Sequence, residues 1–220
     1  MGNDSGVPLW ERGIAMSVLL LLSPLLLLLI LWVKVVSPGP GLFLSDRIGK
    51  DGSIFRLFKL RTMVPNSPQV LSDDLLTVVE NNDARLICGG KILRKGFDEL
   101  FQLINVAKGE MRFVGPRPDM VWMKDYYLPD VLPRISIPPG ITGWAQILGS
   151  RNMSTRQGYL LDLWYIDHRN CLLDVGIFLW TPLYVFFGLT LPEQIRDRCF
   201  NEMAGTGPTY SGEKKRGSVI

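Results

Sequence analysis

The 220-residue sequence contains little histidine and little cysteine. His168 is its single histidine, so no second imidazole can share a metal ion, and we interpret this residue as structural. The three cysteines, Cys88, Cys171 and Cys199, lie far apart and show no paired spacing. This argues against a zinc site or a disulfide framework and favours a reducing compartment, with the cysteines as small apolar residues.

A concentrated positive charge is also missing. The chain has 24 lysines and arginines against 21 aspartates and glutamates, which gives a net charge of +3, and the basic residues are scattered. Duplex nucleic acid requires a dense basic stripe, so we expect no nucleic acid partner. The small positive excess suits anionic phosphates or lipid head groups, and the length is enough for one domain plus one appended element.

One long uncharged run rich in leucine is present at residues 13–33, and it can cross a bilayer core of about 30 Å. No small-residue cleavage site follows it, which argues against a secretory signal peptide. Pro24 removes a backbone hydrogen bond near the middle of the run and Ser23 can satisfy a freed carbonyl, so we expect a kink. Arg12 and Lys34 draw both ends toward the cytoplasm, and the residues fit either a re-entrant hairpin or a kinked span.

A β-hairpin is predicted around Asp51-Gly52, which lies between two apolar-rich runs. Lys59 and Arg61 stand two residues apart on the second predicted strand, so they would share one face. Two cations on one face can hold a diphosphate. They can equally form a solvated strand edge, which is the commoner arrangement.

Asp98 and Glu99 are adjacent acids at the start of a helical pattern that runs from Phe97 and ends at Gly109. Acids are favoured in a first helical turn because the backbone N–H groups there are unpaired, so capping is one explanation. Metal-assisted phosphate chemistry is the other. Burial raises a carboxylate pKa, whereas a metal and a helix N-terminus lower it, so one acid can stay ionised as a nucleophile. The spacing alone does not say which acid does so.

Arg117 stands between Pro116 and Pro118, whose backbone angles are locked. Its guanidinium is therefore presented from a stiff backbone, and a planar fork held in place suits a phosphate. A loop rich in proline and glycine follows at residues 137–146. This loop can line a nucleotide pocket or merely turn the chain, and turning is the commoner role.

The last part of the chain contains a second apolar stretch. Residues 175–192 are uncharged, rich in aromatic side chains and interrupted by Pro182, which fits an interfacial helix in the head-group layer. A buried core helix is the alternative. The tail from Asn201 has a composition typical of disorder, and residues 64–90 predict a polar surface segment with one short helix.

Seven motifs follow one another along the chain. They are Pro38-Gly39-Pro40, Lys59-Leu60-Arg61-Thr62-Met63, Asp98-Glu99-Leu100, Lys108-Gly109-Glu110-Met111, Val114-Gly115-Pro116-Arg117-Pro118, Pro139-Gly140-Ile141-Thr142-Gly143-Trp144-Ala145-Gln146 and Asp162-Leu163-Trp164-Tyr165. In this order they resemble the bacterial sugar transferases, also called monotopic phosphoglycosyl transferases. The resemblance covers about residues 13–189 and is far more specific than any one motif.

The resemblance implies an α+β fold, mainly helical, with a small β-hairpin and interfacial amphipathic helices. It also implies a re-entrant helix, broken at Ser23-Pro24, that enters one leaflet of the bacterial inner membrane from the cytoplasmic face. We therefore expect a membrane helix at residues 1–37, a catalytic domain at 38–200 and a flexible tail at 201–220. The small, single-domain form is favoured, because no further membrane domain precedes the apolar run.

The implied activity is a two-step transfer of a sugar 1-phosphate from a UDP-sugar to a polyprenol phosphate such as undecaprenyl phosphate, with release of UMP. This is the first membrane step of a bacterial glycoconjugate pathway, such as exopolysaccharide biosynthesis. Asp98 would form an aspartyl-phosphosugar, Glu99 would orient or activate the acceptor phosphate, and Mg²⁺ held near Asp98 would offset charge. Substrate contacts are expected at Arg117, Lys59, Arg61, Arg94 and Arg151, with Lys95 as the alternative to Arg94.

A non-catalytic, membrane-anchored scaffold with the same fold is the alternative function. The presence of Asp98, Glu99 and Arg117 together favours the enzyme, because a scaffold has no need to keep all three. Membrane lipid is an expected partner in either case, and the sequence is compatible with a homo-oligomer.

Overall fold

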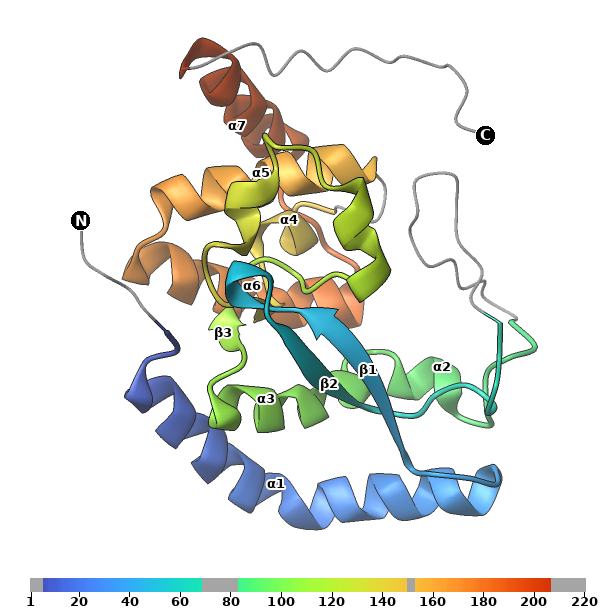
Figure 1. The fold of residues 1–220 in the computed structure, drawn as a ribbon. Coiled ribbons are helices and arrows are strands. Elements are labelled where there is room, and N and C mark those ends of the chain that lie inside the picture. The colour runs from blue at the N-terminus through green and yellow to red at the C-terminus, as the bar shows by residue number, and fades with distance from the viewer. Residues whose placement is uncertain (1–5, 69–82, 150–152, 207–220) are drawn as a thin grey trace.

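The structure is a computed structural model that describes residues 6–68, 83–149 and 153–206. It is mainly helical with two small two-stranded sheets, in agreement with the expected α+β class (Figure 1). The helices are α1 (Leu9–Val36), α2 (Gly90–Leu93), α3 (Leu103–Lys108), α4 (Trp144–Ile147), α5 (Thr155–His168), α6 (Cys171–Phe187) and α7 (Glu193–Thr206). The strands are β1 (Leu42–Ile48), β2 (Ile54–Leu60), β3 (Arg112–Val114) and β4 (Gly140–Thr142), and 3₁₀ turns form at Lys50–Gly52, Phe97–Gln102, Val121–Tyr126 and Leu132–Ile135.

The apolar run forms most of α1, a continuous helix that changes direction near its middle (Figure 1). Pro24 lies inside the helix, and Ser23 Oγ donates to the Leu20 carbonyl oxygen at 2.7 Å. Because proline has no N–H to continue the hydrogen-bond ladder, the bend has a local cause. The predicted kink is confirmed, and the predicted break takes the form of a bend without loss of helix. Within the described ranges, α1 is the one helix long and apolar enough to cross a membrane.

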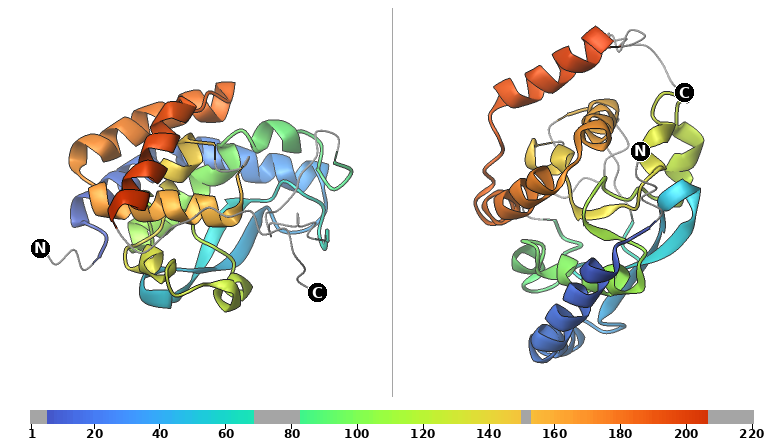
Figure 2. Two further views of the ribbon diagram at one scale, coloured as in Figure 1. Left: turned by 90° about the horizontal axis from the view of Figure 1, so that it is seen from above. Right: turned by 90° about the vertical axis from the view of Figure 1, so that its left-hand side faces the viewer.

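Both ends of α1 are bound to the rest of the protein. At its start, buried Glu11 accepts a hydrogen bond from Arg112 Nε at 2.8 Å. Just past its end, Arg61 donates to the carbonyl oxygens of Ser37 and Pro38, at 2.7 and 2.6 Å. Between these contacts, the inner side of α1 packs on α3 and β2 through two apolar clusters. The helix therefore lies along the domain instead of projecting from it, at the opposite end of the molecule from α7 (Figures 1 and 2).

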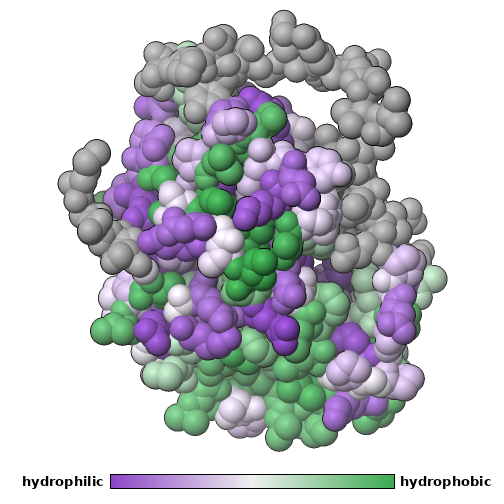
Figure 3. Space-filling model, viewed as in Figure 1, coloured by the Kyte–Doolittle hydropathy of each residue, from purple (hydrophilic) through white to green (hydrophobic). Residues whose placement is uncertain are grey.

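The outward side of α1 is apolar and exposed. Figure 3 shows apolar side chains gathered at the lower end of the molecule, where α1 lies. An exposed apolar patch of this extent marks a contact surface. Its exposed members include Leu20, Leu21, Leu27, Leu28, Leu31 and Val35.

The predicted hairpin is confirmed. Strands β1 and β2 pair antiparallel, from Leu42 opposite Leu60 to Ile48 opposite Ile54. At the turn, the backbone of Gly52 has φ +77°, a left-handed conformation that glycine adopts without strain.

A second, parallel sheet joins β3 to β4. The backbones come so close here that a Cβ atom on Gly140 would lie 2.1 Å from the Gly115 nitrogen, so only glycine fits. The pairing holds the Pro116-Arg117-Pro118 segment against the loop at residues 137–146. This loop does more than turn the chain, because it supplies β4 and the start of α4.

Helices α4 to α7 form the other end of the molecule around the largest apolar cluster (Figure 1). In α6, Ile177 is buried, whereas Phe178, Leu179 and Phe187 are exposed. The helix continues through Pro182. The alternative of a fully buried core helix is therefore wrong, and α6 lies at the surface with one side packed inward.

The predicted start of the flexible tail at Asn201 is wrong for residues 201–206, which continue α7 to Thr206. This turn is held because buried Met203 packs against Leu160 and Leu163 of α5. Residues 207–220 lie outside the described residues, as does much of the polar segment at 64–90. Helix α2 begins only at Gly90, the last residue of that segment, so the short helix predicted within residues 64–90 stays a prediction for the part outside the described residues.

Candidate active site

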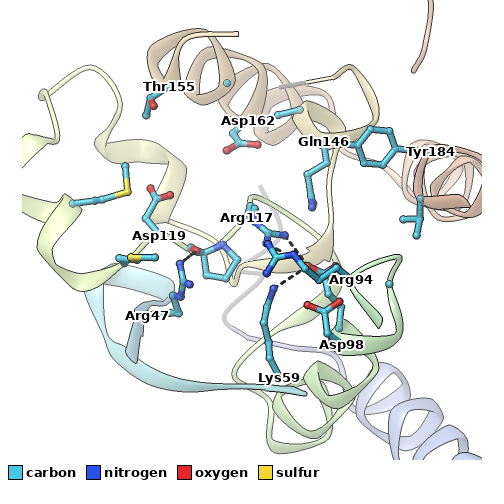
Figure 4. Close-up of a pocket in the computed structure, with 18 of the residues that line it drawn as sticks. Arg47, Lys59, Arg94, Asp98, Arg117, Asp119, Gln146, Thr155, Asp162 and Tyr184 are labelled. Atoms are coloured by element: carbon cyan, nitrogen blue, oxygen red, sulfur yellow. Dashed lines mark hydrogen bonds and ion pairs between the residues drawn. The ribbon is translucent and has the colours of Figure 1, made fainter. Parts of the chain in front are cut away.

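A cavity of about 630 Å³ lies between the two ends of the molecule. This volume lies in the range of small-molecule sites. Its walls come from the end of β2, the first 3₁₀ turn after α2, the segment after β3, and helices α4, α5 and α6 (Figure 4). The lining has more cationic than anionic side chains: Arg47, Lys59, Lys91, Arg94, Arg117 and Arg134 against Asp98, Glu99, Asp119 and Asp162.

The acid pair lies on the 3₁₀ turn Phe97–Gln102, which leads into α3 and ends at Gly109 as predicted. The N-cap of this turn is Gly96, with φ +98°, and no side chain caps it by a hydrogen bond. The sequence pattern suggested a regular helix, whereas the structure has tighter 3₁₀ winding over the acids. Both acids do lie in the first turn, but Glu99 accepts its hydrogen bonds from cationic side chains.

Glu99 is held between two cations. Its Oε1 accepts from Lys59 Nζ at 3.0 Å and from both terminal nitrogens of Arg117 at 3.3 Å. Burial alone would raise the pKa of Glu99, but the charges of Lys59 and Arg117 outweigh it and lower the pKa to about 2. Glu99 is therefore ionised and is a weak base.

Asp98 has a different environment, although it is the adjacent residue. It is 7% exposed, and no described group donates to its Oδ1. Burial raises the pKa of Asp98 above its usual value, against the opposing charge of Lys59. A buried carboxylate oxygen without a partner is costly, so it is poised to meet a ligand or an ion.

The pKa values of the two cations depend in turn on the neighbouring acids. Burial lowers the pKa of Lys59, and the charge of Glu99 opposes this shift. The charge of Glu99 raises the pKa of Arg117. Figure 4 shows Lys59 and Arg117 converging beside Asp98. Such a convergence of cations can hold a diphosphate.

Behind Arg117 lies a buried ion-pair network that sequence reasoning missed. Arg134 is 3% exposed and donates to the Arg117 carbonyl oxygen at 2.7 Å, so it fixes the backbone that carries Arg117. It also binds the carboxylates of Asp119 and Asp162. Burial raises the pKa of Asp162 to about 6, against the opposing charge of Arg134. Asp162 was visible in the sequence only as part of a family-like motif.

Of the other predicted substrate contacts, some line the cavity and others do not. Arg94 lines the cavity, and its charge opposes the rise in the Asp98 pKa that burial causes, whereas Lys95 is outside the lining. Arg61 is also outside it, so its prediction as a substrate contact is corrected. Strand β2 ends at Leu60, and the Arg61 guanidinium turns to the carbonyl oxygens that follow α1. Arg151 lies outside the described residues.

Two further residues that line the cavity could not be recognised as site residues from local sequence patterns. Arg47, at the end of β1, donates to the Pro118 carbonyl oxygen at 3.3 Å, and burial with the nearby charge of Arg117 lowers its pKa to about 10. Gln146 presents a buried side-chain oxygen with no partner among the residues described. In the sequence, Gln146 stood out only as part of a family-like motif, and no pattern indicated that Arg47 belongs to the site.

The scarce histidine and cysteines stay outside this site. His168 Nδ1 lies 2.8 Å from the Trp164 carbonyl oxygen, and the His168 ring stacks on the Trp164 ring. Cys88, Cys171 and Cys199 are free thiols.

Magnesium would fit this site only with help from a substrate. Within the described ranges, no group of three His, Cys, Asp or Glu side chains converges to hold a metal. Mg²⁺ usually keeps several waters and takes one or two carboxylates plus substrate phosphates. Asp98, with its unpartnered oxygen, meets that requirement as a single protein ligand.

The geometry is thus that of a phosphate-binding site with a buried carboxylate, in a protein that also carries a long apolar helix. Sequence comparison agrees, because the pattern of the bacterial sugar transferase family matches residues 8–188. The chain belongs to this family.

Its relatives include two enzymes named for undecaprenyl-phosphate substrates. The chain is 39% identical over 172 residues to UDP-glucose:undecaprenyl-phosphate glucose-1-phosphate transferase of Caulobacter vibrioides, covering 73% of this chain and 62% of the relative. It is 37% identical over 164 residues to UDP-N-acetylgalactosamine-undecaprenyl-phosphate N-acetylgalactosaminephosphotransferase of Aeromonas hydrophila, covering 71% and 38%. The chain thus spans less than two thirds of these two relatives.

For a third relative, the similarity to this chain covers most of the relative's length. The uncharacterized sugar transferase EpsL of Bacillus subtilis is 35% identical over 170 residues, which cover 77% of this chain and 81% of EpsL.

Proposed function

We propose that this protein is a phosphoglycosyl transferase that moves a sugar 1-phosphate from a UDP-sugar to a polyprenol phosphate such as undecaprenyl phosphate. The observation that carries the proposal is the buried Asp98 carboxylate, with an unpartnered oxygen, beside Lys59, Arg94 and Arg117. The names of the relatives join UDP-sugars to undecaprenyl phosphate and support the same substrates.

In the first step, a carboxylate oxygen of Asp98 attacks the β-phosphorus of the UDP-sugar. A bond forms between this oxygen and the phosphorus, and the bond from the phosphorus to the bridging oxygen breaks. UMP leaves with the bridging oxygen, and the phosphosugar stays on Asp98. Lys59 and Arg117 stabilise the negative charge of the transferring group, which is the main catalytic requirement of phosphoryl transfer.

In the second step, a phosphate oxygen of the acceptor attacks the same phosphorus. The bond to Asp98 breaks, the carboxylate is restored, and a polyprenyl diphosphosugar is formed. The acceptor phosphate has an ionised oxygen at neutral pH and needs no strong base. Because the pKa of Glu99 is about 2, we assign Glu99 to holding Lys59 and Arg117 in place, in preference to proton abstraction.

Asp98 is also the residue that would hold Mg²⁺. When bound, the ion supplies positive charge that offsets the diphosphate. Among the described carboxylates that line the cavity, Asp98 is the one available to an ion, because Glu99, Asp119 and Asp162 are all bound to cationic side chains.

We further propose that α1 enters one leaflet of the inner membrane as a re-entrant helix and leaves the catalytic domain on the cytoplasmic face. The contacts at the two ends of α1 support this, because Glu11 with Arg112 and Arg61 with Ser37 bind both ends to one domain. A helix that crossed the bilayer would have to break one of these contacts. The bend at Pro24 and the exposed apolar outer side suit a shallow insertion.

The test uses purified protein with Mg²⁺ and a panel of UDP-sugars, first without a lipid acceptor. We expect UMP release in an amount comparable to the enzyme, and continuous release once polyprenol phosphate is added. Asp98→Asn should lose at least about a thousandfold in rate, since an amide cannot act as the nucleophile. No UMP with any UDP-sugar, with or without polyprenol phosphate, would instead favour the scaffold alternative.

A further inference from the structure

The last turn of α6 forms part of the cavity wall. Tyr184, Val185 and Gly188 line the same cavity as Asp98 (Figure 4). A Cβ atom on Gly188 would meet no other atom within 4 Å, so the wall opens at this point. The last turn of α6 thus reaches the same cavity as the acid pair.

The contact between α6 and the acid-bearing turn is close. The Phe186 and Phe97 rings meet edge to face, with centroids 6.5 Å apart. A Cβ atom on Gly96 would lie 2.9 Å from a methyl carbon of Val185. Because Phe97 directly precedes Asp98, this turn of α6 lies beside the proposed nucleophile.

Exposed apolar side chains stand next to lining residues on both α6 and α2. Phe187, which precedes the lining residue Gly188, is 73% exposed, and Ile92, which follows the lining residue Lys91, is 64% exposed. Next to Ile92, Lys91 lines the cavity, as does Arg94 just after α2. Exposed apolar groups beside cations suit one kind of ligand: a long apolar chain that ends in a phosphate.

We infer that the gap between α2 and the last turn of α6 is the entrance for the polyprenol phosphate acceptor. The chain would lie against Phe187 and Ile92, and Lys91 would guide the phosphate toward Asp98. The sugar nucleotide has no apolar tail, so the part of the cavity near Thr155, away from Tyr184 in Figure 4, is left for the donor. This inference rests on the proposed function and adds the route of its second substrate.

Separate measurements of the two half-reactions distinguish a role in acceptor binding from a general role in catalysis. Phe187→Ser and Ile92→Ser should each raise the KM for a long-chain polyprenol phosphate by about tenfold, the effect of losing one large apolar contact. The single-turnover rate of UMP release without acceptor should change by less than about twofold. The matched control is Leu172→Ser, at the other end of α6, which is 84% exposed and should leave both measurements unchanged.

Acceptor length separates the chain contact from the phosphate contact. With a short, water-soluble prenyl phosphate, Phe187→Ser should have no effect, whereas Lys91→Ala should still raise KM. If Leu172→Ser weakens transfer as much as Phe187→Ser, the apolar side of α6 only holds the protein on the micelle, and the inference is wrong. It is also wrong if the Phe187 and Ile92 variants slow UMP release and transfer equally.

A direct binding measurement keeps this inference separate from the proposed activity. A photoreactive polyprenyl phosphate should label the peptides that contain Ile92 or Phe187, and the matching alcohol without phosphate should label them less. This labelling does not require a UDP-sugar. Labelling of other peptides would show that the acceptor does not enter between α2 and α6, even if UMP is released. Absence of UMP release would instead contradict the proposed transferase activity, and the labelling result would still report where the polyprenyl phosphate binds.

Discussion

At the scale of single residues, two adjacent carboxylates differ because their surroundings differ. Burial raises the pKa of Asp98, which also has an oxygen without a described partner, whereas two cations lower the pKa of Glu99 to about 2. Adjacent acids whose pKa values are pushed apart are a common way to divide catalytic roles. In the proposed function, this division makes Asp98 the group that meets the substrate and Glu99 the group that holds the cations.

This division predicts how the pH profile responds to Glu99→Gln. UMP release needs ionised Asp98, so the rate falls as the pH drops through the Asp98 pKa. The negative charge of Glu99 raises that pKa, so its removal should move the acid limb to lower pH. The rate on the plateau should fall by roughly tenfold to a hundredfold, because Lys59 and Arg117 lose the group that aligns them.

Single-turnover UMP release from pH 4 to 8 measures both effects of Glu99→Gln. Arg56→Gln, which removes a cation from an exposed strand position, is the control and should leave the profile unchanged. An acid limb that moves to higher pH in Glu99→Gln would contradict the assignment.

At the scale of elements, buried Arg134 connects three parts of the fold. It lies in the 3₁₀ turn Leu132–Ile135 and binds Asp162 of α5, Asp119 and the backbone of Arg117. The stiff presentation of Arg117 therefore depends on more than its flanking prolines. Removal of one partner from such a buried network costs about 3 to 5 kcal/mol, because the other charge is left unpaired.

Asp162 gives this network a measurable pH dependence. Its pKa is about 6 in the folded protein, against about 3.9 for an unfolded aspartate, so the folded state binds the proton more tightly. Its contribution to the free energy of unfolding should therefore be greatest below about pH 4 and fall by about 2 kcal/mol as the pH rises to 6.

Denaturant unfolding of detergent-solubilised protein from pH 4 to 6 tests this contribution. Asp162→Asn should remove the fall, whereas Asp46→Asn, on the exposed strand β1, should keep it. Equal slopes in the wild type and Asp162→Asn would show that Asp162 is not the titrating group.

Local patterns predicted the elements well, and long-range contacts were the part they could not predict. The hairpin at Asp51-Gly52, the kink at Pro24 and the helix end at Gly109 follow from residue types a few positions apart. Arg134 and Arg61 take their roles from partners far along the chain. For Arg61 the strand pattern was misleading, because β2 ends one residue earlier and the side chain turns away from the site.

At the scale of the whole molecule, α1 and the domain that it packs against form one connected body. The domain binds both ends of α1, and the apolar outer side of the helix faces away from it (Figure 3). The active site and the proposed membrane surface therefore keep a fixed relation to each other. A fixed relation suits an enzyme whose donor is soluble and whose acceptor lies in a bilayer.

This arrangement predicts the topology of the N-terminus. Exposed Cys88 marks the side of the catalytic domain, and a Gly6→Cys variant that lacks Cys88 and Cys171 marks the start of α1. A membrane-impermeant thiol reagent should label both positions from the cytoplasmic side of inverted vesicles. Labelling of Gly6→Cys from the periplasmic side alone would mean that α1 spans the bilayer.

In the proposed reaction, Asp98 carries the sugar phosphate between the two steps. The direct measurement is peptide mass spectrometry of protein that is acid-quenched after incubation with UDP-sugar and Mg²⁺ in the absence of acceptor. We predict a mass increase equal to one sugar phosphate on the peptide containing Asp98, which disappears when polyprenol phosphate is added before the quench. UMP release with no adduct on that peptide, or with the adduct on another residue, would contradict the role of Asp98 as the nucleophile.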